Sequence, residues 1–470
     1  MRTFNQIDTS RWRQYTQATT QFYGLNRGMT VIDGEMNDME NLTSDYFPQL
    51  APCLPRVTGH MMLGGTYRGS IAKGNDIYSV CGGRLYKNGE WVEAVELEDC
   101  GNLEDGHKLM VGMGAQILIW PDKIVYNTIT GEVAHMGNKW RASGEVSLSP
   151  CTLNGTLLAD GKYTVSDTKP SSPANGDYWY DTKNNLLMIY ASSAKAWQQV
   201  NSTYIRMECE GIGNGFKLND AVYLGSTAED KKLVFVGDTP DDAEVKSREV
   251  MNDMLGSSYV VYAVEDDYVV ITGLICADLV TTSITLERRV PDFSHVCEAN
   301  NRIWGCQYGE SYSMDGSYVN QLMACALGDP MNWETYDQVS TDSYAVSLGS
   351  DGPFTGGIAL NGVPCFFKEG VLTRISGSTP TQFSTEVTGC RGVDAGDGRS
   401  LCRIEQSLIY KGLDDVLMYN NSQWQSIGEK LGKTTLSGNT IASTVHGLKY
   451  CLLLPDGLYV YDYAKGLWHR

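Results

Sequence analysis

A unit of about 40 residues that recurs along the chain constrains the fold more than any other sequence feature. Each copy has an apolar run, a Gly or Asn turn, a second run that ends in Tyr, another turn and then a Trp, which is Trp140 in the second copy. Equivalent tyrosines lie 40 positions apart at Tyr86 and Tyr126 and 42 positions apart at Tyr419 and Tyr461. Several strands in a period of this length are typical of a β-propeller blade. We therefore predict an all-β fold built around a β-propeller.

The turns inside these units favour antiparallel hairpins. Asn88-Gly89 separates two alternating runs, and Asn-Gly is the strongest short-range hairpin signal. Fifty glycines and 27 tyrosines among 470 residues also fit a protein of turns and strands. A solenoid or an array of sandwiches would repeat as well. The propeller is favoured because small sheets stacked around an axis bury each other's apolar faces. The short turns of a solenoid rarely contain a hairpin and a Trp in every unit.

The repeats divide the sequence into four segments. Residues 55–140 and 291–470 carry the repeated units and are expected to form the propeller blades, five, six or seven in number. Residues 141–290 lack the repeat and predict a β-rich inserted domain, with one helix over Asp241–Leu255. Residues 1–54 match neither pattern, so we expect an extended N-terminal arm.

Charge and hydropathy exclude several classes of protein. The formal net charge of −19 argues against a general binder of nucleic acid or anionic membranes, which needs Lys and Arg to neutralise phosphates. The longest apolar run, Val269–Ala277, is far shorter than the roughly 20 residues that span a bilayer. The first residues lack the apolar segment of a secretory signal, so we expect synthesis in a cytosol and no membrane insertion.

Motifs that carry chemistry are missing from the sequence. The thirteen cysteines include no C-x-x-C pair, and the six histidines lack metal-binding spacing, so we predict reduced cysteines and no metal or cofactor. Neighbouring carboxylates on a strand point to opposite faces, so the many acidic pairs are not catalytic dyads. We expect no enzyme activity and no catalytic residues.

One aromatic group offers a different function. Trp179, Tyr180 and Trp197 lie on a predicted hairpin and could stack on a sugar ring. The alternative is a structural role, because alternation along the hairpin would bury about half of these side chains.

Several motifs resemble structural proteins from the tail and head-tail connector modules of bacteriophages and prophages of Gram-positive bacteria. They lie on both sides of the predicted insertion and comprise Phe22–Arg27, Asp33–Leu50, Arg288–Phe293, Asn300–Gly305, Leu327–Trp333 and Gly349–Gly356.

This resemblance implies a non-enzymatic virion protein of the neck or tail, made in the host bacterial cytoplasm, that forms a ring similar to nozzle or stopper proteins. Its partners would be further copies of itself, the portal or adaptor, other tail proteins, and genomic DNA that passes through the lumen without specific binding. An acidic lumen suits this role because it repels the duplex. The arm would dock on a neighbouring subunit through Phe22, Tyr23, Asn26, Arg27, Asp45 and Phe47.

Two alternatives remain open from the sequence. The arm could instead be an edge strand of the first blade. The whole protein could instead be a propeller that binds or cleaves glycans on the host surface, since some propellers carry glycoside hydrolases.

Overall fold

The computed structural model describes residues 21–49, 51–54, 65–93, 103, 106–158, 162–237, 239–311 and 316–470. Strands make up 46 % of the residues that the structure describes, and the same residues contain one α-helix. None of the sheets in the described ranges closes on itself. The predicted all-β class is confirmed. The chain divides into two compact units: unit 1 is Met1–Gly59, Phe367–Leu372 and Thr388–Arg470, and unit 2 is His60–Phe366 and Thr373–Val387.

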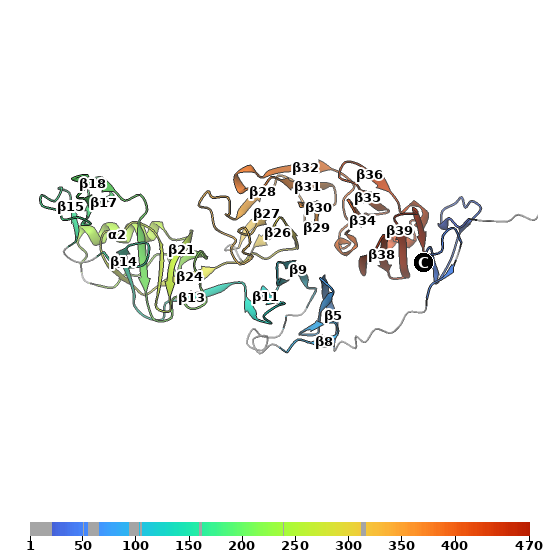
Figure 1. Cartoon of the computed structure of the whole chain (residues 1–470), viewed down its shortest axis with the longest axis horizontal. Coiled ribbons are helices and arrows are strands. Elements are labelled where there is room, and N and C mark those ends of the chain that lie inside the picture. Colours follow the sequence, from blue (N-terminus) through green and yellow to red (C-terminus); the bar gives the residue numbers. More distant parts are fainter. Residues whose placement is uncertain are drawn as a thin grey trace, which may run out of the picture. The chain divides into compact units, whose positions relative to one another are not determined.

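Four-stranded sheets in which the strands follow chain order account for the repeats of unit 2 (Figure 1). The first two are β5 (Tyr67–Lys73), β6 (Asp76–Cys81), β7 (Arg84–Lys87), β8 (Glu90–Trp91), and β9 (Leu109–Met113), β10 (Gln116–Trp120), β11 (Ile124–Asn127), β12 (Val133–His135). The third is β25 (His295–Ala299), β26 (Arg302–Ser311), β27 (Ser317–Ala324), β28 (Tyr344–Ser347). The fourth, through which the division between the units passes, is β29 (Gly356–Leu360), β30 (Val363–Lys368), β31 (Val371–Ser376), β32 (Ser384–Gly389).

Consecutive sheets of unit 2 pack against each other. Their first strands are neighbours, with β5 against β9, β9 against β25 and β25 against β29. Leu85 of one sheet and Ile117 of the next share one buried cluster, and Leu118 and Met323 share the cluster that follows. The second and third sheets therefore each bury apolar side chains against a neighbouring sheet on two sides, and this burial stabilises them.

Residues 138–288 form a separate eight-stranded sheet rather than further repeats. Its order is β13-β24-β20-β21-β22-β19-β14-β23. The strands are β13 (Asn138–Arg141), β14 (Val146–Cys151), β19 (Tyr204–Glu208), β20 (Ala221–Ser226), β21 (Ser258–Glu265), β22 (Tyr268–Thr272), β23 (Leu279–Thr281) and β24 (Ile284–Arg288). Trp140, expected in the second repeat, instead lies in β13 of this sheet, because β13 pairs with the distant β24 and not with β12.

A helix and a small sheet accompany the eight strands. The helix predicted over Asp241–Leu255 is confirmed as α2 (Asp242–Asp253), and the Asp241 carboxylate caps it by accepting from the Glu244 amide. Met251 of α2 is buried in the core of the large sheet. The small sheet is β15 (Tyr163–Ser166), β16 (Tyr178–Asp181), β17 (Leu186–Ala191) and β18 (Ala196–Gln199).

The Leu327–Trp333 motif joins residues 138–288 to the third repeated sheet. The Trp333 ring lies 4.8 Å from the Phe293 ring and 6.3 Å from the Trp120 ring, centroid to centroid. One residue earlier, the Asn332 side-chain oxygen accepts from the Ala221 amide of β20 at 2.8 Å. This motif therefore has a structural task, which is to hold the eight-stranded sheet against a repeated sheet.

Unit 1 contains two more four-stranded repeats and the N-terminal segment. The repeats are β33 (Cys402–Ile404), β34 (Ser407–Lys411), β35 (Val416–Tyr419), β36 (Trp424–Ser426), and β37 (Ala442–His446), β38 (Lys449–Leu454), β39 (Gly457–Asp462), β40 (Leu467–His469). The N-terminal segment has only short strands, β1 (Gly24–Leu25), β2 (Glu35–Met36), β3 (Leu42–Thr43) and β4 (Ala51–Pro52). In the described residues none of these strands joins β5–β8.

Candidate functional site

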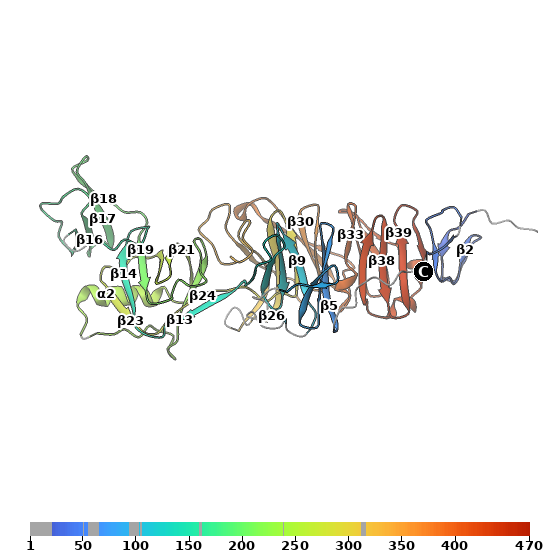
Figure 2. The ribbon, with the colours of Figure 1, turned by 60° about the horizontal axis from the view of Figure 1, so that its bottom comes forward.

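The N-terminal segment, defined here as residues 21–54, lies against the last repeated sheet, β37–β40. Strand β1 contacts β40, and β1 pairs with β2 in parallel. Figure 2 shows β2 beside the C-terminal end of the chain, next to the sheet that contains β38 and β39. We call this contact the arm interface. It is the candidate functional site because it contains the residues that the sequence analysis assigned to docking.

Apolar side chains form the centre of the arm interface. Phe22, Leu25 and Met39 are at most 5 % exposed and share one buried cluster with Leu467 and Trp468 of β40. Burial of a side chain of this size stabilises by about 1.5–3 kcal/mol. The segment is therefore held by a real hydrophobic core and not only by surface polar contacts.

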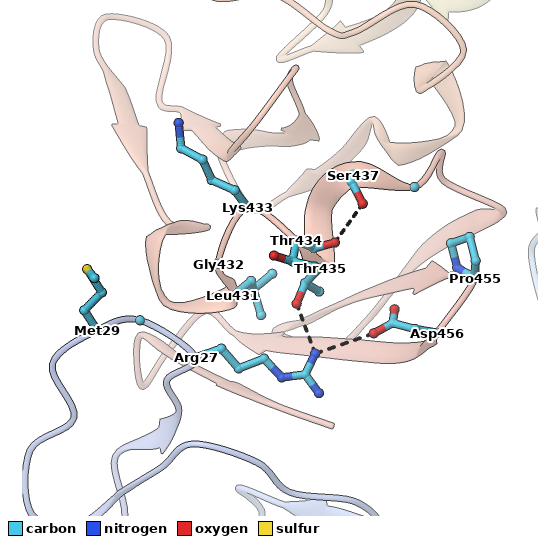
Figure 3. A pocket seen from close by; sticks show the side chains of 12 residues that line it. Arg27, Met29, Leu431, Gly432, Lys433, Thr434, Thr435, Ser437, Pro455 and Asp456 are labelled. Atoms are coloured by element: carbon cyan, nitrogen blue, oxygen red, sulfur yellow. Dashed lines mark hydrogen bonds and ion pairs between the residues drawn. The ribbon is translucent and has the colours of Figure 1, made fainter.

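Arg27 makes the most connections across the arm interface. Across the interface its Nη1 donates to the Tyr459 hydroxyl at 2.7 Å and to Thr435 Oγ1 at 3.0 Å. Within the segment itself, Nη2 pairs with Asp38 at 3.1 Å. A longer ion pair of 3.5 Å reaches Asp456 (Figure 3). Because a guanidinium presents its donors in a fixed fork, this set of acceptors fixes the orientation of the segment.

Glu35 is the second anchor. It accepts from Lys430 Nζ at 2.7 Å and from the Asn26 side-chain nitrogen at 2.6 Å, and its own side chain is 3 % exposed. Burial alone would raise the pKa of Glu35, but the hydrogen bonds from Lys430 and Asn26 lower it below the ordinary value. Glu35 is therefore held as a carboxylate at neutral pH.

A third set of contacts fastens the middle of the segment. Asp45 pairs with Lys449 at 2.5 Å, and Ser44 Oγ donates to the Asp462 carboxylate at 2.6 Å. The hydrogen bond from Lys449 lowers the pKa of Asp45. Burial opposes the same change at Asp462, but Ser44 and Lys465 lower its pKa as well. We refer to Glu35, Asp45 and Asp462 as the arm carboxylates.

The predicted docking residues lie together in the structure, where most of them contact the last repeated sheet, β37–β40, of the same chain. Phe22 is buried there and Phe47 packs against the same cluster. Asn26, Arg27 and Asp45 make the polar contacts described above. Tyr23 is 38 % exposed and contributes little buried surface to the arm interface. Whether these residues also dock on a neighbouring copy stays a prediction.

Sequence reasoning missed the other half of the arm interface. Its members Lys430, Thr435, Lys449, Asp456, Tyr459 and Arg470 lie about 400 positions from their partners, and no motif marks them. The Asp33–Leu50 string contained Glu35, but a single carboxylate in a Gly- and Asn-rich segment carries no signal for a distant lysine. The arm interface is therefore visible only in three dimensions.

A cavity of about 600 Å³ opens beside Arg27 (Figure 3). Its wall combines Met29 from the arm with Lys433, Thr435, Ser437 and Asp456 from the other side. Met29 is fully exposed, and Val31 and Ile32 nearby are 42 % and 58 % exposed. This tip of the arm offers apolar surface outside the arm interface.

The three predicted sugar-stacking residues are less accessible than the sequence suggested. Trp179 is 7 % and Tyr180 is 1 % exposed, and the Trp179 indole donates to the Ser166 carbonyl. Trp197 is half-buried, and its ring meets those of Trp179 and Tyr190 edge-on at 5.6 and 5.5 Å. The three do not form a flat stacking platform, since Tyr180 points into the opposite, apolar side of the small sheet.

The described residues include no group of three or more His, Cys, Asp and Glu side chains placed to hold a metal ion. Their cysteines are free thiols. No helix in the same residues has the length and apolar character to cross a membrane.

Comparisons with known proteins give only distant structural similarity. No known protein family matches the chain, and no curated protein is significantly similar to it in sequence. The solved structures that it resembles include apo AztD from Citrobacter koseri, at 10 % identity and a TM-score of 0.23, with 77 % of this chain and 79 % of that chain covered. Another is PorZ, a surface component of the type-IX secretion system of Porphyromonas gingivalis, at 12 % identity and a TM-score of 0.23, with 85 % and 57 % covered.

A third is the extracellular domain of a one-component system of B. thetaiotaomicron. It has 11 % identity and a TM-score of 0.18, with 86 % of this chain and 71 % of that chain covered.

Proposed function

We propose that the protein is a non-enzymatic structural subunit that assembles into a ring in the neck or tail of a phage particle, where the ring retains or conducts DNA. The observation that carries this proposal is the arm interface. A segment outside the repeated sheets adheres to the last sheet and the residues before it through an apolar centre and three sets of polar contacts, made by Arg27, Glu35 and Asp45. Such a segment is suited to joining one subunit to the next.

The six repeated sheets in the described residues are proposed to be the blades of one β-propeller, with residues 141–290 inserted between the second and third blades. The support comes from the four-stranded order of each sheet and from the adjacent first strands of consecutive sheets. In a propeller the first strands line the axis and the sheets stack face to face. Propeller surfaces of this kind serve as rigid platforms for assembly.

Exchange of the arm between copies would close the ring. Thirteen residue steps separate Leu54, at the end of the arm, from Tyr67, where β5 begins, and an extended chain of that length reaches about 45 Å. The same contacts can therefore form within one chain or between two chains. Head-to-tail exchange of an identical segment generates a closed ring when the rotation between neighbours closes.

The net charge supports passage of DNA rather than binding. At −19 per chain, a ring of identical copies carries a strongly negative total charge. Phosphates are repelled by such a surface, so a duplex would pass without being held.

Carbodiimide coupling of native residues tests arm exchange without any substitution. Protein assembled from equal amounts of ¹⁴N and ¹⁵N chains is treated with carbodiimide, which joins Lys430 to Glu35 and Lys449 to Asp45 because these pairs are in contact. If the arm docks on the neighbouring copy, about half of the linked peptide pairs will contain both isotopes. The Lys139 to Glu287 pair, 2.9 Å apart within one sheet, is the matched control and remains unmixed.

Links with only one isotope at both arm pairs, together with a monomer in mass photometry, would refute the ring. Location is tested separately by cryo-electron microscopy of whole phage particles. Absence of the chain from virions, or its presence only at fibre tips far from the DNA path, would refute the conduit role.

A further inference from the structure

A second cavity, of about 320 Å³, lies on the eight-stranded sheet where β13, β24 and β20 are paired. Arg141 pairs with Thr285, which pairs with Gly225, and one row further Lys139 pairs with Glu287, which pairs with Tyr223. Directly paired residues project from the same face of a sheet, so these side chains form one floor. Lys231 and Gly256, from two loops, complete the wall.

The charges in this cavity are unusual for so acidic a protein. Three cationic side chains, Lys139, Arg141 and Lys231, line it together with one carboxylate, Glu287. Lys139 is neutralised by Glu287 at 2.9 Å. Among the described residues, the side chains of Arg141 and Lys231 have no ion-pair or hydrogen-bond partner, so two positive charges are left for a ligand.

The floor also provides room and hydroxyl groups. Gly225 has no side chain, and a Cβ at that position would lie 2.7 Å from Thr285 Oγ1, so the glycine keeps the floor open. Ser226 and Thr227 add hydroxyls at the edge. The Arg289 guanidinium lies 3.6 Å from the centre of the Tyr223 ring and stacks on it. The volume is at the lower end of the range for ligand pockets and suits one sugar ring.

We propose that this cavity, the cationic pocket, binds an acidic sugar such as a uronic acid unit of a surface polysaccharide. Arg141 and Lys231 bind the carboxylate through charge-assisted hydrogen bonds. Thr227, Thr285 and the Glu287 carboxylate hydrogen-bond the sugar hydroxyls. The site goes beyond the proposed ring function and does not depend on it, because every residue of the pocket lies in the segment 138–288 of unit 2.

Glu287 favours a sugar acid over a bare phosphate. Its side chain is 33 % exposed at the pocket, where it would repel a phosphate dianion but accept hydrogen bonds from hydroxyl groups. A ligand with one negative charge at one end and hydroxyls at the other satisfies both the cations and this carboxylate.

Binding is tested by titrating the full-length protein with D-glucuronic acid, D-glucose and inorganic phosphate, using ligand-observed NMR. Glucuronic acid is expected to bind, more weakly as salt is raised, and glucose is not. Arg141→Ala and Lys231→Ala should each weaken binding roughly tenfold, since each removes a charge-assisted contact. Lys195→Ala is the matched control, because Lys195 is also an exposed lysine with a left-handed backbone (φ 49° against 56° at Lys231) and is not part of the pocket.

Three results would overturn the assignment. They are no binding of glucuronic acid at millimolar concentration, equal affinity for phosphate and glucuronic acid, and equal affinity of the Lys231→Ala and Lys195→Ala proteins. Circular dichroism of each variant shows whether it is folded. The isotope-mixing experiment is independent of these results, so failure of the pocket and failure of the ring can be told apart.

Discussion

Leu25→Ala is predicted to release the arm without unfolding the repeated sheets. Leu25 is 0 % exposed and lies in the centre of the arm interface. Removing a buried leucine side chain costs about 2–5 kcal/mol, through lost burial and the cavity that remains. That energy corresponds to roughly 30-fold to several thousandfold in the ratio of docked to released arm.

Hydrogen–deuterium exchange with mass spectrometry measures this ratio directly. The amides of Tyr23, Asn26 and Arg27 donate to Gly34, Met36 and Lys430 carbonyls in the docked arm. Their exchange should accelerate by the factor given above in Leu25→Ala, while amides of β10 keep their rates. Met29→Ala is the control, since Met29 belongs to the same segment but is fully exposed, and it should change nothing.

Two outcomes would refute the reasoning. If Leu25→Ala and Met29→Ala exchange alike, the apolar centre does not hold the arm. If exchange accelerates equally in the arm and in β10, the arm is not a separately dissociable element.

Three further predictions follow from charge and burial. The arm carboxylates have lowered pKa values, so their contribution to docking is complete above the unfolded pKa values near 4 and is lost as pH falls through the folded values. The protection factor of the arm amides, which is the intrinsic exchange rate at each pH divided by the observed rate, should therefore be constant from pH 7 to 5 and fall at pH 3. Lys411→Met leaves the buried Asp397 carboxylate without its cation and should cost about 3–5 kcal/mol in urea unfolding, whereas exposed Arg403→Met should cost under about 0.5. Cys53 is exposed and should react with iodoacetamide in the native protein. Burial raises the pKa of Cys297 well above the ordinary value, so Cys297 should react only after unfolding. Equal reaction rates of the two thiols in the native protein would contradict the burial of Cys297.

The repeated sheets could be predicted because their pairing is local. Asn88 takes the left-handed backbone that the Asn-Gly turn requires, and β7 and β8 pair across this turn. Hydrophobic alternation, turn residues and spacing are all present within each 40-residue window. The helix after Asp241 was readable for the same reason, since its cap and its acidic first turn lie within four residues.

Long-range pairings could not be predicted. Trp140 looked like the tryptophan of a repeat, but β13 pairs with β24, and Trp140 faces Leu286 in that register. The contact of Glu35 with Lys430 joins residues 395 positions apart. A single sequence contains both partners but does not show that they lie close together in the fold. Trp179 and Tyr180 show a further limit, because neighbouring strand residues can both be buried when each face of a small sheet is covered.

The pairing of β13 with β24 has a consequence for how this chain can change over evolutionary time. Asn138 lies opposite Arg288, so the chain enters and leaves the eight-stranded sheet at one spot. A segment with adjacent ends can be lengthened, shortened or replaced without moving the strands before and after it. The surface carried by residues 138–288, including the cationic pocket, can therefore be exchanged by recombination at this spot while the repeated sheets keep their sequence.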